Sequence, residues 1–191
     1  YQITIYEKNI SINLEKGYGI QLSVNSVKLL NKIGFKELKN SEKFTPEKIN
    51  FYSNKVSNKI CELDIADFNS VDCKYTTLKR STLISFLKRD LGELIKTGYN
   101  ISKIDQQSKK IKLFFENDET IECDYLIISD GVFSKSKNLI SNNEAKPKYN
   151  NTLAIRGILN KSPENIDSKN IALFLGSDFH HVIYPVSPNG E

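Results

Sequence analysis

Apolar residues recur at helical spacing in an early segment of the chain. After Ser23, the residues Val27, Leu30 and Ile33 lie three positions apart, which would place them on one face of a helix. Ser23 or Asn25 can cap the start of such a helix, and Gly34 stands where helices commonly end. The pattern predicts an amphipathic helix between these two residues.

A second segment predicts a longer helix, which would begin near Ser81 and end at Thr97-Gly98. Its apolar residues recur at intervals that would build one broad face: Leu83, Ile84, Leu87, Leu91, Leu94 and Ile95. A face of this width is typical of a helix that packs against a sheet or another helix.

Short apolar or alternating runs elsewhere predict β-strands. The chain opens on one such run, 1–6, and a turn at 116–118 predicts a hairpin between 110–115 and 120–123. Further strands are expected at 49–52, 59–63, 101–104, 153–159, 171–175 and 181–186. The polar stretch 135–151 is interpreted as a crossover between elements.

The run Tyr125–Ile128 differs from the others because it is apolar without alternation. This pattern is typical of a strand that is covered on both faces, as in a parallel α/β sheet. Asp130-Gly131 follows it directly, and open α/β sheets bind their ligands at the carboxyl ends of such strands. Asp-Gly is also a common turn pair, so an ordinary turn remains the alternative.

Composition and charge narrow the classes of partner. The 191 residues can bury a sizeable core, and no apolar run approaches the roughly 18 residues that span a bilayer. The net charge of +4 comes mostly from scattered lysines, and only Arg80, Arg89 and Arg156 are arginines. Because nucleic-acid-binding proteins cluster their basic residues and rely on arginine, no nucleic-acid partner is expected.

Cysteine and histidine lack the spacing of a metal site. The three cysteines, Cys61, Cys73 and Cys123, form no CxxC pair, and the only histidines are His180 and His181. We therefore expect no bound metal and no disulfide framework, and a reduced, cytoplasmic compartment fits best.

Several single residues have two interpretations each. Glu7 ends the first strand, where an acidic residue could bind a ribose, but it could also be a solvated carboxylate. Arg80 precedes a helix and could reach a phosphate or pair with a surface carboxylate. On a strand, His180 would share a face with Tyr184, so both could line a cavity, and a buried structural histidine is the alternative.

The order of these motifs resembles one family, the single-component FAD-dependent aromatic hydroxylases, which include salicylate hydroxylase, 6-hydroxynicotinate monooxygenase and the ubiquinone-pathway hydroxylases. The resemblance covers essentially the whole chain. The segments that carry it are Glu7-Lys8, Gly17-Tyr-Gly-Ile-Gln-Leu-Ser-Val-Asn25, Leu30–Gly34, Leu78-Lys-Arg-Ser-Thr-Leu83, Asp124–Ser134, Leu175-Gly176 and His180-His-Val-Ile-Tyr-Pro-Val186.

The resemblance implies a role for each matching residue. Glu7, with Lys8, would hold the adenosine ribose of FAD, Arg80 would contact its phosphates, and Gln21 would lie beside the isoalloxazine. Asp130 and Gly131 would lie near the dinucleotide and the approach of the nicotinamide cofactor. His180 and Tyr184 are the implied catalytic residues at the aromatic substrate. His180 is favoured as the base that deprotonates a phenol, because histidine titrates near neutral pH.

The implied function is an NAD(P)H- and FAD-dependent monooxygenase that hydroxylates a small aromatic or quinol-type molecule with O2 through a flavin hydroperoxide. Peripheral membrane contact is expected only if the substrate is a quinone, and the sequence gives no oligomeric state. The chain departs from the family pattern at Val24, Lys79, Ile128, Ser129 and Lys137. Departures of this kind leave open a non-catalytic α/β binding module, or another flavin oxidoreductase such as a dehydrogenase or halogenase.

The fold expected is α/β: a partial Rossmann-like FAD-binding domain without its first strand, and a second, mostly antiparallel β-sheet substrate domain. The first would span 1–151, with the hairpin as an insertion and a segment near 45–75 as a candidate part of the substrate domain. The second would begin in 152–191. Since the chain has no Met and no GxGxxG turn, we expect it to be an internal fragment of a longer flavoprotein that is inactive alone.

Overall fold

The computed structural model describes residues 1–14, 17–55, 58–106, 109–141, 146–161 and 163–188. The chain has a mixed α/β fold that divides into two compact units. Unit 1 contains residues 1–13 and 91–154, and unit 2 contains residues 14–90 and 155–191. Each unit is therefore built from two stretches that are distant in the sequence. The strands of the described residues form four sheets, two in each unit.

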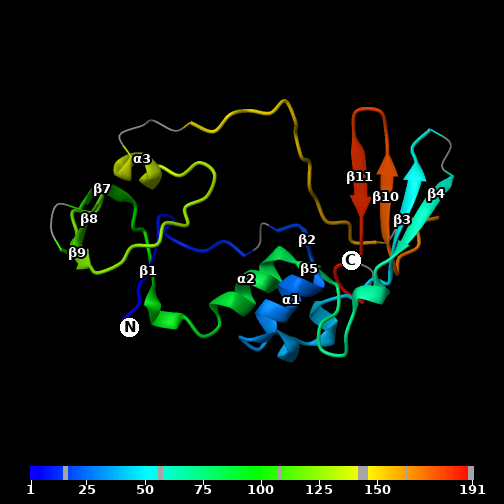
Figure 1. The fold of residues 1–191 in the computed structure, drawn as a ribbon, viewed down its shortest axis with the longest axis horizontal. Helices are drawn as coiled ribbons and strands as arrows, with labels where there is room; N and C mark the ends of the chain where they lie inside the picture. The colour runs from blue at the N-terminus through cyan, green and yellow to red at the C-terminus, as the bar shows by residue number, and fades with distance from the viewer. Residues whose placement is uncertain (15–16, 56–57, 107–108, 142–145, 162, 189–191) are drawn as a thin grey trace. The chain divides into compact units, whose positions relative to one another are not determined.

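Unit 2 contains a helical layer on a two-stranded sheet. Strand β2 (Gly19–Leu22) pairs antiparallel with β5 (Thr76–Lys79), and each strand leads into a helix: α1 (Val24–Asn31) after β2, α2 (Arg80–Lys88) after β5 (Figure 1). The short 3-10 helices η1 (Phe35–Glu37) and η2 (Asn40–Glu42) follow α1. The core of this layer is Leu22, Val27, Phe35, Leu78 and Phe86.

The second sheet of unit 2 has four strands in the order β11-β10-β3-β4 (Figure 1). They are β3 (Lys48–Ser53), β4 (Lys59–Asp64), β10 (Ile171–Leu175) and β11 (His180–Ile183), and η3 (Ala66–Phe68) follows β4. The central pair, β3 with β10, is parallel, and the two outer pairs are antiparallel. Segments from both stretches of the unit thus form one sheet.

Unit 1 is built around aromatic and branched side chains. Strand β1 (Ile5–Glu7) pairs parallel with β6 (Ile95–Thr97). The 3-10 helix η4 (Gly92–Leu94) directly precedes β6. Helix α3 (Ser136–Ile140) lies near the end of the unit in the sequence. The strands β7 (Ile101–Asp105), β8 (Ile111–Phe115) and β9 (Thr120–Cys123) form an antiparallel sheet. Ile104, Leu113 and Phe115 are buried at its centre.

The first predicted helix is confirmed, with Ser23 at its N-cap position, although the serine side chain makes no capping hydrogen bond. The second helix is shorter than predicted. It begins at Arg80, ends at Lys88 and buries Phe86, a residue outside the predicted stripe. The segment from Ile95 to Thr97 is instead strand β6, because pairing with β1 satisfies its backbone groups.

Two predicted strands are wrong. Residues 153–159 form no strand, and Tyr125–Ile128 pairs with no strand among the described residues. Leu126 and Ile128 pack on the core of unit 1, whereas Tyr125 and Ile127 are 82% and 88% exposed. The run is therefore covered on one side only. The hairpin and the strands near 49–52, 59–63 and 171–175 are confirmed, and 142–145 of the predicted crossover lie outside the described residues.

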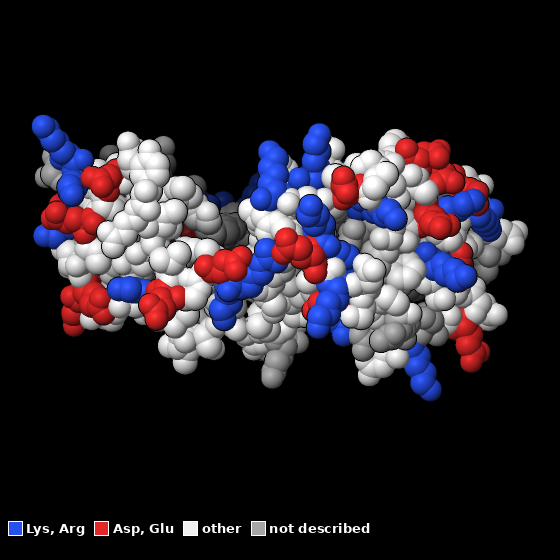
Figure 2. All heavy atoms as spheres, turned by 90° about the horizontal axis from the view of Figure 1, so that it is seen from below, with Lys and Arg blue, Asp and Glu red and all other residues white. Residues whose placement is uncertain are grey.

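Two further observations bear on the class of protein. No helix in the part of the chain that the structure describes is long and apolar enough to cross a membrane. The same residues contain no group of three or more His, Cys, Asp or Glu side chains that could hold a metal ion. Figure 2 shows basic and acidic side chains interspersed on the face that it presents.

The core of unit 2 yields a stability prediction. Phe35 is 1% exposed and meets Phe86 edge-on, with ring centroids 5.2 Å apart. Phe35→Ala should lower the free energy of unfolding by about 3–5 kcal/mol, because it removes the ring and leaves a cavity. Leu29→Ala on α1 is the control, since Leu29 is 63% exposed and its loss should cost less than about 0.5 kcal/mol. Urea denaturation measures both, and equal effects would contradict the burial.

Candidate functional site

The predicted site residues fall into two groups, one in each unit. Glu7, Lys8, Asp130 and Gly131 lie in unit 1. Gln21, Arg80, His180 and Tyr184 lie in unit 2. The geometry of each group is described separately.

In unit 1, Glu7 is the last residue of β1 and its carboxylate faces the chain that follows. Its Oε1 accepts hydrogen bonds from the backbone N–H and the side-chain amide of Asn9, at 2.8 and 2.7 Å. Its Oε2 has no hydrogen bond among the residues that the structure describes, so this oxygen can accept one from a ligand. Lys8 is exposed.

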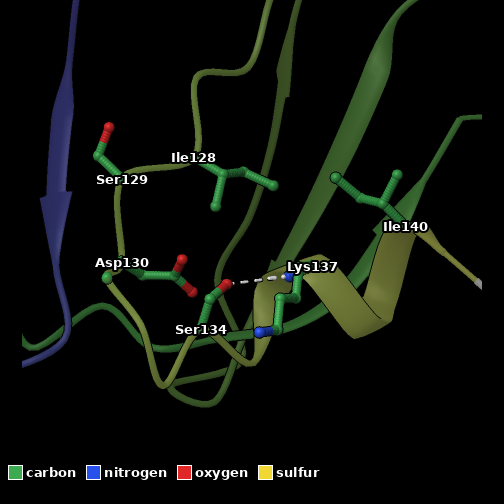
Figure 3. Close-up of a pocket in the computed structure, with 7 residues that line it drawn as sticks. Ile128, Ser129, Asp130, Ser134, Lys137 and Ile140 are labelled. Atoms are coloured by element: carbon green, nitrogen blue, oxygen red, sulfur yellow. Dashed lines mark hydrogen bonds between the residues drawn. The ribbon is translucent and has the colours of Figure 1, made fainter. Parts of the chain in front are cut away.

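The Asp-Gly turn of unit 1 lines an open cavity of about 620 Å³ (Figure 3). Gly131 has a φ of 83°, a left-handed conformation that favours glycine. The Asp130 carboxylate accepts a hydrogen bond from the Ser136 backbone N–H at 3.2 Å, and Ser134 Oγ accepts one from Lys137 N–H at 3.1 Å. The residues around the cavity are Ile128, Ser129, Asp130, Gly131, Ser134, Lys137 and Ile140.

The charge of Asp130 is stabilised by these contacts. Partial burial by itself would raise the pKa of the carboxyl, but hydrogen bonds from Ser134 and Ser136 outweigh it and lower the pKa below its ordinary value. Asp130 therefore fixes the local loop and presents an anionic carboxylate to the cavity.

In unit 2, the Gly17–Gly19 segment and Arg80 come together at the start of α2. The backbone N–H of Arg80 donates to the carbonyl of Tyr18 at 2.8 Å. A Cβ on Gly17 would lie 3.6 Å from the Ser81 backbone nitrogen, so this loop runs directly beside the helix start. The Arg80 guanidinium is half-buried and has no hydrogen bond or ion pair within the described ranges of the chain, which leaves its charge available to an anion.

Gln21 and Tyr184 also come together, although they are far apart in the sequence. Gln21 Oε1 accepts a hydrogen bond from the Tyr75 hydroxyl at 2.7 Å, and Gln21 lies near enough to Tyr184 to act on its pKa. The ring of Tyr184 lies against Gly19, where a Cβ would be 2.6 Å from Cε2 and 2.8 Å from the hydroxyl oxygen. Only a glycine at position 19 leaves room for this ring.

Burial dominates the ionisation of both tyrosines. It raises the pKa of Tyr75, and the neighbouring Tyr184 raises it further. Burial also raises the pKa of Tyr184, against smaller lowering effects of the Arg156 charge and the Gln21 hydrogen bond. Both phenols therefore carry their protons at neutral pH.

The two histidines occupy opposite faces of one sheet. His180 is exposed at the start of β11 and pairs in register with Leu175. His181 pairs with Phe174, and its ring centroid is 5.2 Å from that of Phe179. The alternation of a strand places His180 and Val182 on one face and His181 on the other.

Tyr75, Tyr18 and Arg156 were not predicted as site residues. The Arg156 guanidinium lies over the Tyr18 ring, 4.6 Å from its centroid, and acts on Tyr184 through its charge. Arg156 is one of only three arginines in the chain, which is the one sequence signal that could have marked it. Nothing in the local sequence of Tyr75 indicates its partner.

No protein-family model matches the chain. The chain is similar in sequence to two chloroplastic zeaxanthin epoxidases. It is 32% identical to that of Arabidopsis thaliana over 101 residues, which are 52% of the chain and 15% of the relative. It is 30% identical to that of Spinacia oleracea over 107 residues, 55% of the chain and 16% of the relative. The chain thus matches only a small part of the length of these proteins.

Solved structures share the fold over nearly the whole chain. 2,6-Dihydroxypyridine-3-hydroxylase from Arthrobacter nicotinovorans matches 95% of the chain and 45% of its own length, with a TM-score of 0.72 and 16% identity. Klebsiella pneumoniae HpxO, solved with FAD and uric acid, matches 94% of the chain and 46% of its own, with a TM-score of 0.70 and 14% identity. In sequence and in fold, the chain resembles part of the FAD-dependent monooxygenases of the aromatic-hydroxylase type, as its motifs predict.

Proposed function

We propose that the chain is part of an FAD- and NAD(P)H-dependent monooxygenase, which hydroxylates a small aromatic or quinol-type molecule with O2. One observation carries the proposal. The Gly17–Gly19 loop, the start of α2 at Arg80 and the Gln21–Tyr184 pair lie together in unit 2. The family resemblance assigns Arg80 to the FAD phosphates, Gln21 to the isoalloxazine and Tyr184 to the substrate.

The side chains present fit a flavin dinucleotide in their chemistry. Arg80 offers a cation without a protein partner among the described residues, and a diphosphate is a matching anion. Glu7 offers a carboxylate oxygen to the ribose hydroxyls, with Lys8 beside it in the sequence. In the Rossmann-like arrangement that we infer for unit 1, the parallel pair of β1 and β6 would be part of the dinucleotide-binding sheet, and Asp130 and Gly131 would lie near the dinucleotide.

When bound, FAD would supply the redox chemistry, with NAD(P)H as the source of electrons. The residues of this chain would bind and orient. Gln21 would lie beside the isoalloxazine, Tyr184 would donate a hydrogen bond to the substrate, and His180 would accept a proton from it. Tyr184 suits donation better than proton abstraction, because burial raises its pKa. We place the protein in the cytoplasm, with peripheral membrane contact only for a quinone substrate.

Loss of Arg80 tests the cofactor assignment. In the intact protein, Arg80→Ala should weaken FAD binding about tenfold or more, because it removes a charged hydrogen-bond donor. Lys88→Ala on the exposed end of the same helix is the matched control and should leave FAD affinity unchanged. Flavin fluorescence during titration of the apoprotein measures both. An intact protein that purifies without flavin and binds none when FAD is added would favour the non-catalytic binding module.

The histidine pair tests the proposed base. His180→Gln should lower the rate of substrate hydroxylation about a hundredfold, because it removes the group that would accept the substrate's proton. His181→Gln, on the opposite face of β11, should keep the rate. The rate of product formation measures both variants, and equal rates for the two would remove His180 from this role.

A further inference from the structure

The Gln21 side chain lies on the face of the β2–β5 sheet that is turned away from α1 and α2. Side chains alternate along a strand, so Ile20 and Leu22, which pack in the helical core, share one face and Gln21 lies on the other. This second face also carries Thr77, the register partner of Gln21, whose hydroxyl donates to the carbonyl of Pro185. The amide of Gln21 therefore lies outside the helical core, on the side of the segment that follows β11.

Tyr75 engages one end of this amide. It directly precedes β5, and its hydroxyl lies 2.7 Å from Gln21 Oε1. This length is typical of an O–H···O hydrogen bond, in which the phenol donates and the carbonyl oxygen accepts. Burial raises the pKa of Tyr75, so the phenol keeps its proton at neutral pH and remains a donor. The carbonyl end of the amide is thus bound within unit 2.

Tyr75 is itself fixed by its backbone. Its N–H donates to Asn69 Oδ1 at 2.7 Å. Two hydrogen bonds between Ser70 and Cys73 close the segment that separates these residues, one from the Ser70 N–H to the Cys73 carbonyl and one from the Cys73 N–H to Ser70 Oγ. Thr76, the next residue in the chain, is 4% exposed. The hydroxyl therefore reaches its acceptor from a segment that is fixed on both sides.

Fixing the carbonyl end of a primary amide also fixes its donor end. With its oxygen toward Tyr75, Gln21 turns its NH2 group, which carries two N–H donors, in the other direction. An amide that rotated freely would offer a ligand an acceptor about as readily as a donor. The Tyr75 hydrogen bond therefore selects the kind of ligand atom that Gln21 can bind, which is a hydrogen-bond acceptor.

The isoalloxazine of FAD is a ligand for which this selection matters. Its ring nitrogens and carbonyl oxygens include acceptors that take up negative charge when the flavin is reduced, and a hydrogen-bond donor beside such an atom favours the reduced form. The family resemblance assigns Gln21 to this ring and gives Tyr75 no role. The direction of the Tyr75 hydrogen bond supplies what that assignment lacks, namely which end of the amide is available.

We propose that Tyr75 is a positioning residue, which fixes the Gln21 amide so that its NH2 group is offered to an acceptor atom of the isoalloxazine and raises the reduction potential of bound FAD. The flavin as the ligand rests on the proposed function. The orientation of the amide does not, because it follows from the hydrogen bonds of Tyr75 within unit 2.

The sign of one pKa change tests the orientation of the amide. In the intact protein labelled with ¹³Cζ-tyrosine, the Tyr75 resonance, assigned with Tyr75→Phe, is followed by NMR to alkaline pH before FAD is added. Gln21→Leu should lower the pKa of Tyr75, because a donating phenol loses its acceptor. Added burial by the leucine would act in the opposite sense. Leu29→Ala, at an exposed position on α1, is the control and should leave the pKa unchanged. A rise or no change with Gln21→Leu would overturn the orientation.

The reduction potential of bound FAD tests the effect on the cofactor, with circular dichroism verifying that each variant is folded. Gln21→Leu should disfavour the reduced flavin about fivefold, which lowers the potential of a two-electron couple by about 21 mV. Tyr75→Phe should disfavour it about threefold, or about 14 mV, because the amide remains but is no longer oriented. Equilibration with a dye of known potential measures both.

A double variant distinguishes positioning from a general structural role. Once Gln21→Leu has removed the amide, Tyr75→Phe should change the potential no further, because nothing is left for the phenol to orient. Tyr99→Phe in unit 1, which also removes a hydrogen-bonded phenol hydroxyl, is the matched control and should keep the wild-type potential. Additive effects of the two substitutions would overturn the positioning role.

FAD binding by the same samples separates this inference from the proposed function. An intact protein that binds no added FAD would refute both. A protein that binds FAD, and whose potential is the same with and without the Tyr75 hydroxyl, would refute the inference alone and leave the proposed monooxygenase standing.

Discussion

The antiparallel pairing of β2 with β5 is the constraint on which the rest of unit 2 depends. It buries Leu78 completely beneath the helices, and it sets Gly19 opposite Lys79 and Gln21 opposite Thr77. Both helices start within two residues of these strands, so the register also determines where α1 and α2 begin. Thr77 then connects this layer to the segment after β11 through its hydrogen bond to Pro185. A buried hydroxyl without a hydrogen-bond partner would lower the free energy of unfolding. This contact therefore restrains the register of β5 against β2.

The local parts of the fold could be predicted from the sequence, and the parts set by distant pairing could not. The first helix follows from the spacing of Val27 and Leu30, and the hairpin follows from its turn, where Asp118 has a positive φ of 65°. The second helix was predicted too long because Leu94 continues a helical spacing while remaining 42% exposed. Pairing with β1, in the other stretch of unit 1, determines that Ile95 enters a strand.

The candidate site shows the same division. Glu7, Arg80 and Asp130 could be chosen as candidate site residues because they stand at the ends of predicted elements. The hydrogen-bond partners of Glu7 and Asp130 are near neighbours in the sequence, Asn9 and Ser136. The meeting of Gln21 with Tyr75 could not be predicted from the sequence, because β2 and β5 have to pair before these side chains touch. Tyr75 precedes a pair of threonines whose burial also depends on that alignment.

The parallel pair of β3 and β10 has a consequence for how the chain acquires its structure. Ile49 pairs with Ile171, so the second stretch of unit 1, residues 91–154, lies in the loop that this pairing closes. During synthesis, the hairpin of β3 and β4 leaves the ribosome long before its partner, and one edge of β3 stays unpaired until Leu175 has been made. Contacts of such long sequence separation are slow to form, because a large loop must be closed first. Unit 1 can reach its own core in that interval, so its folding shortens the effective distance over which β10 must search for β3.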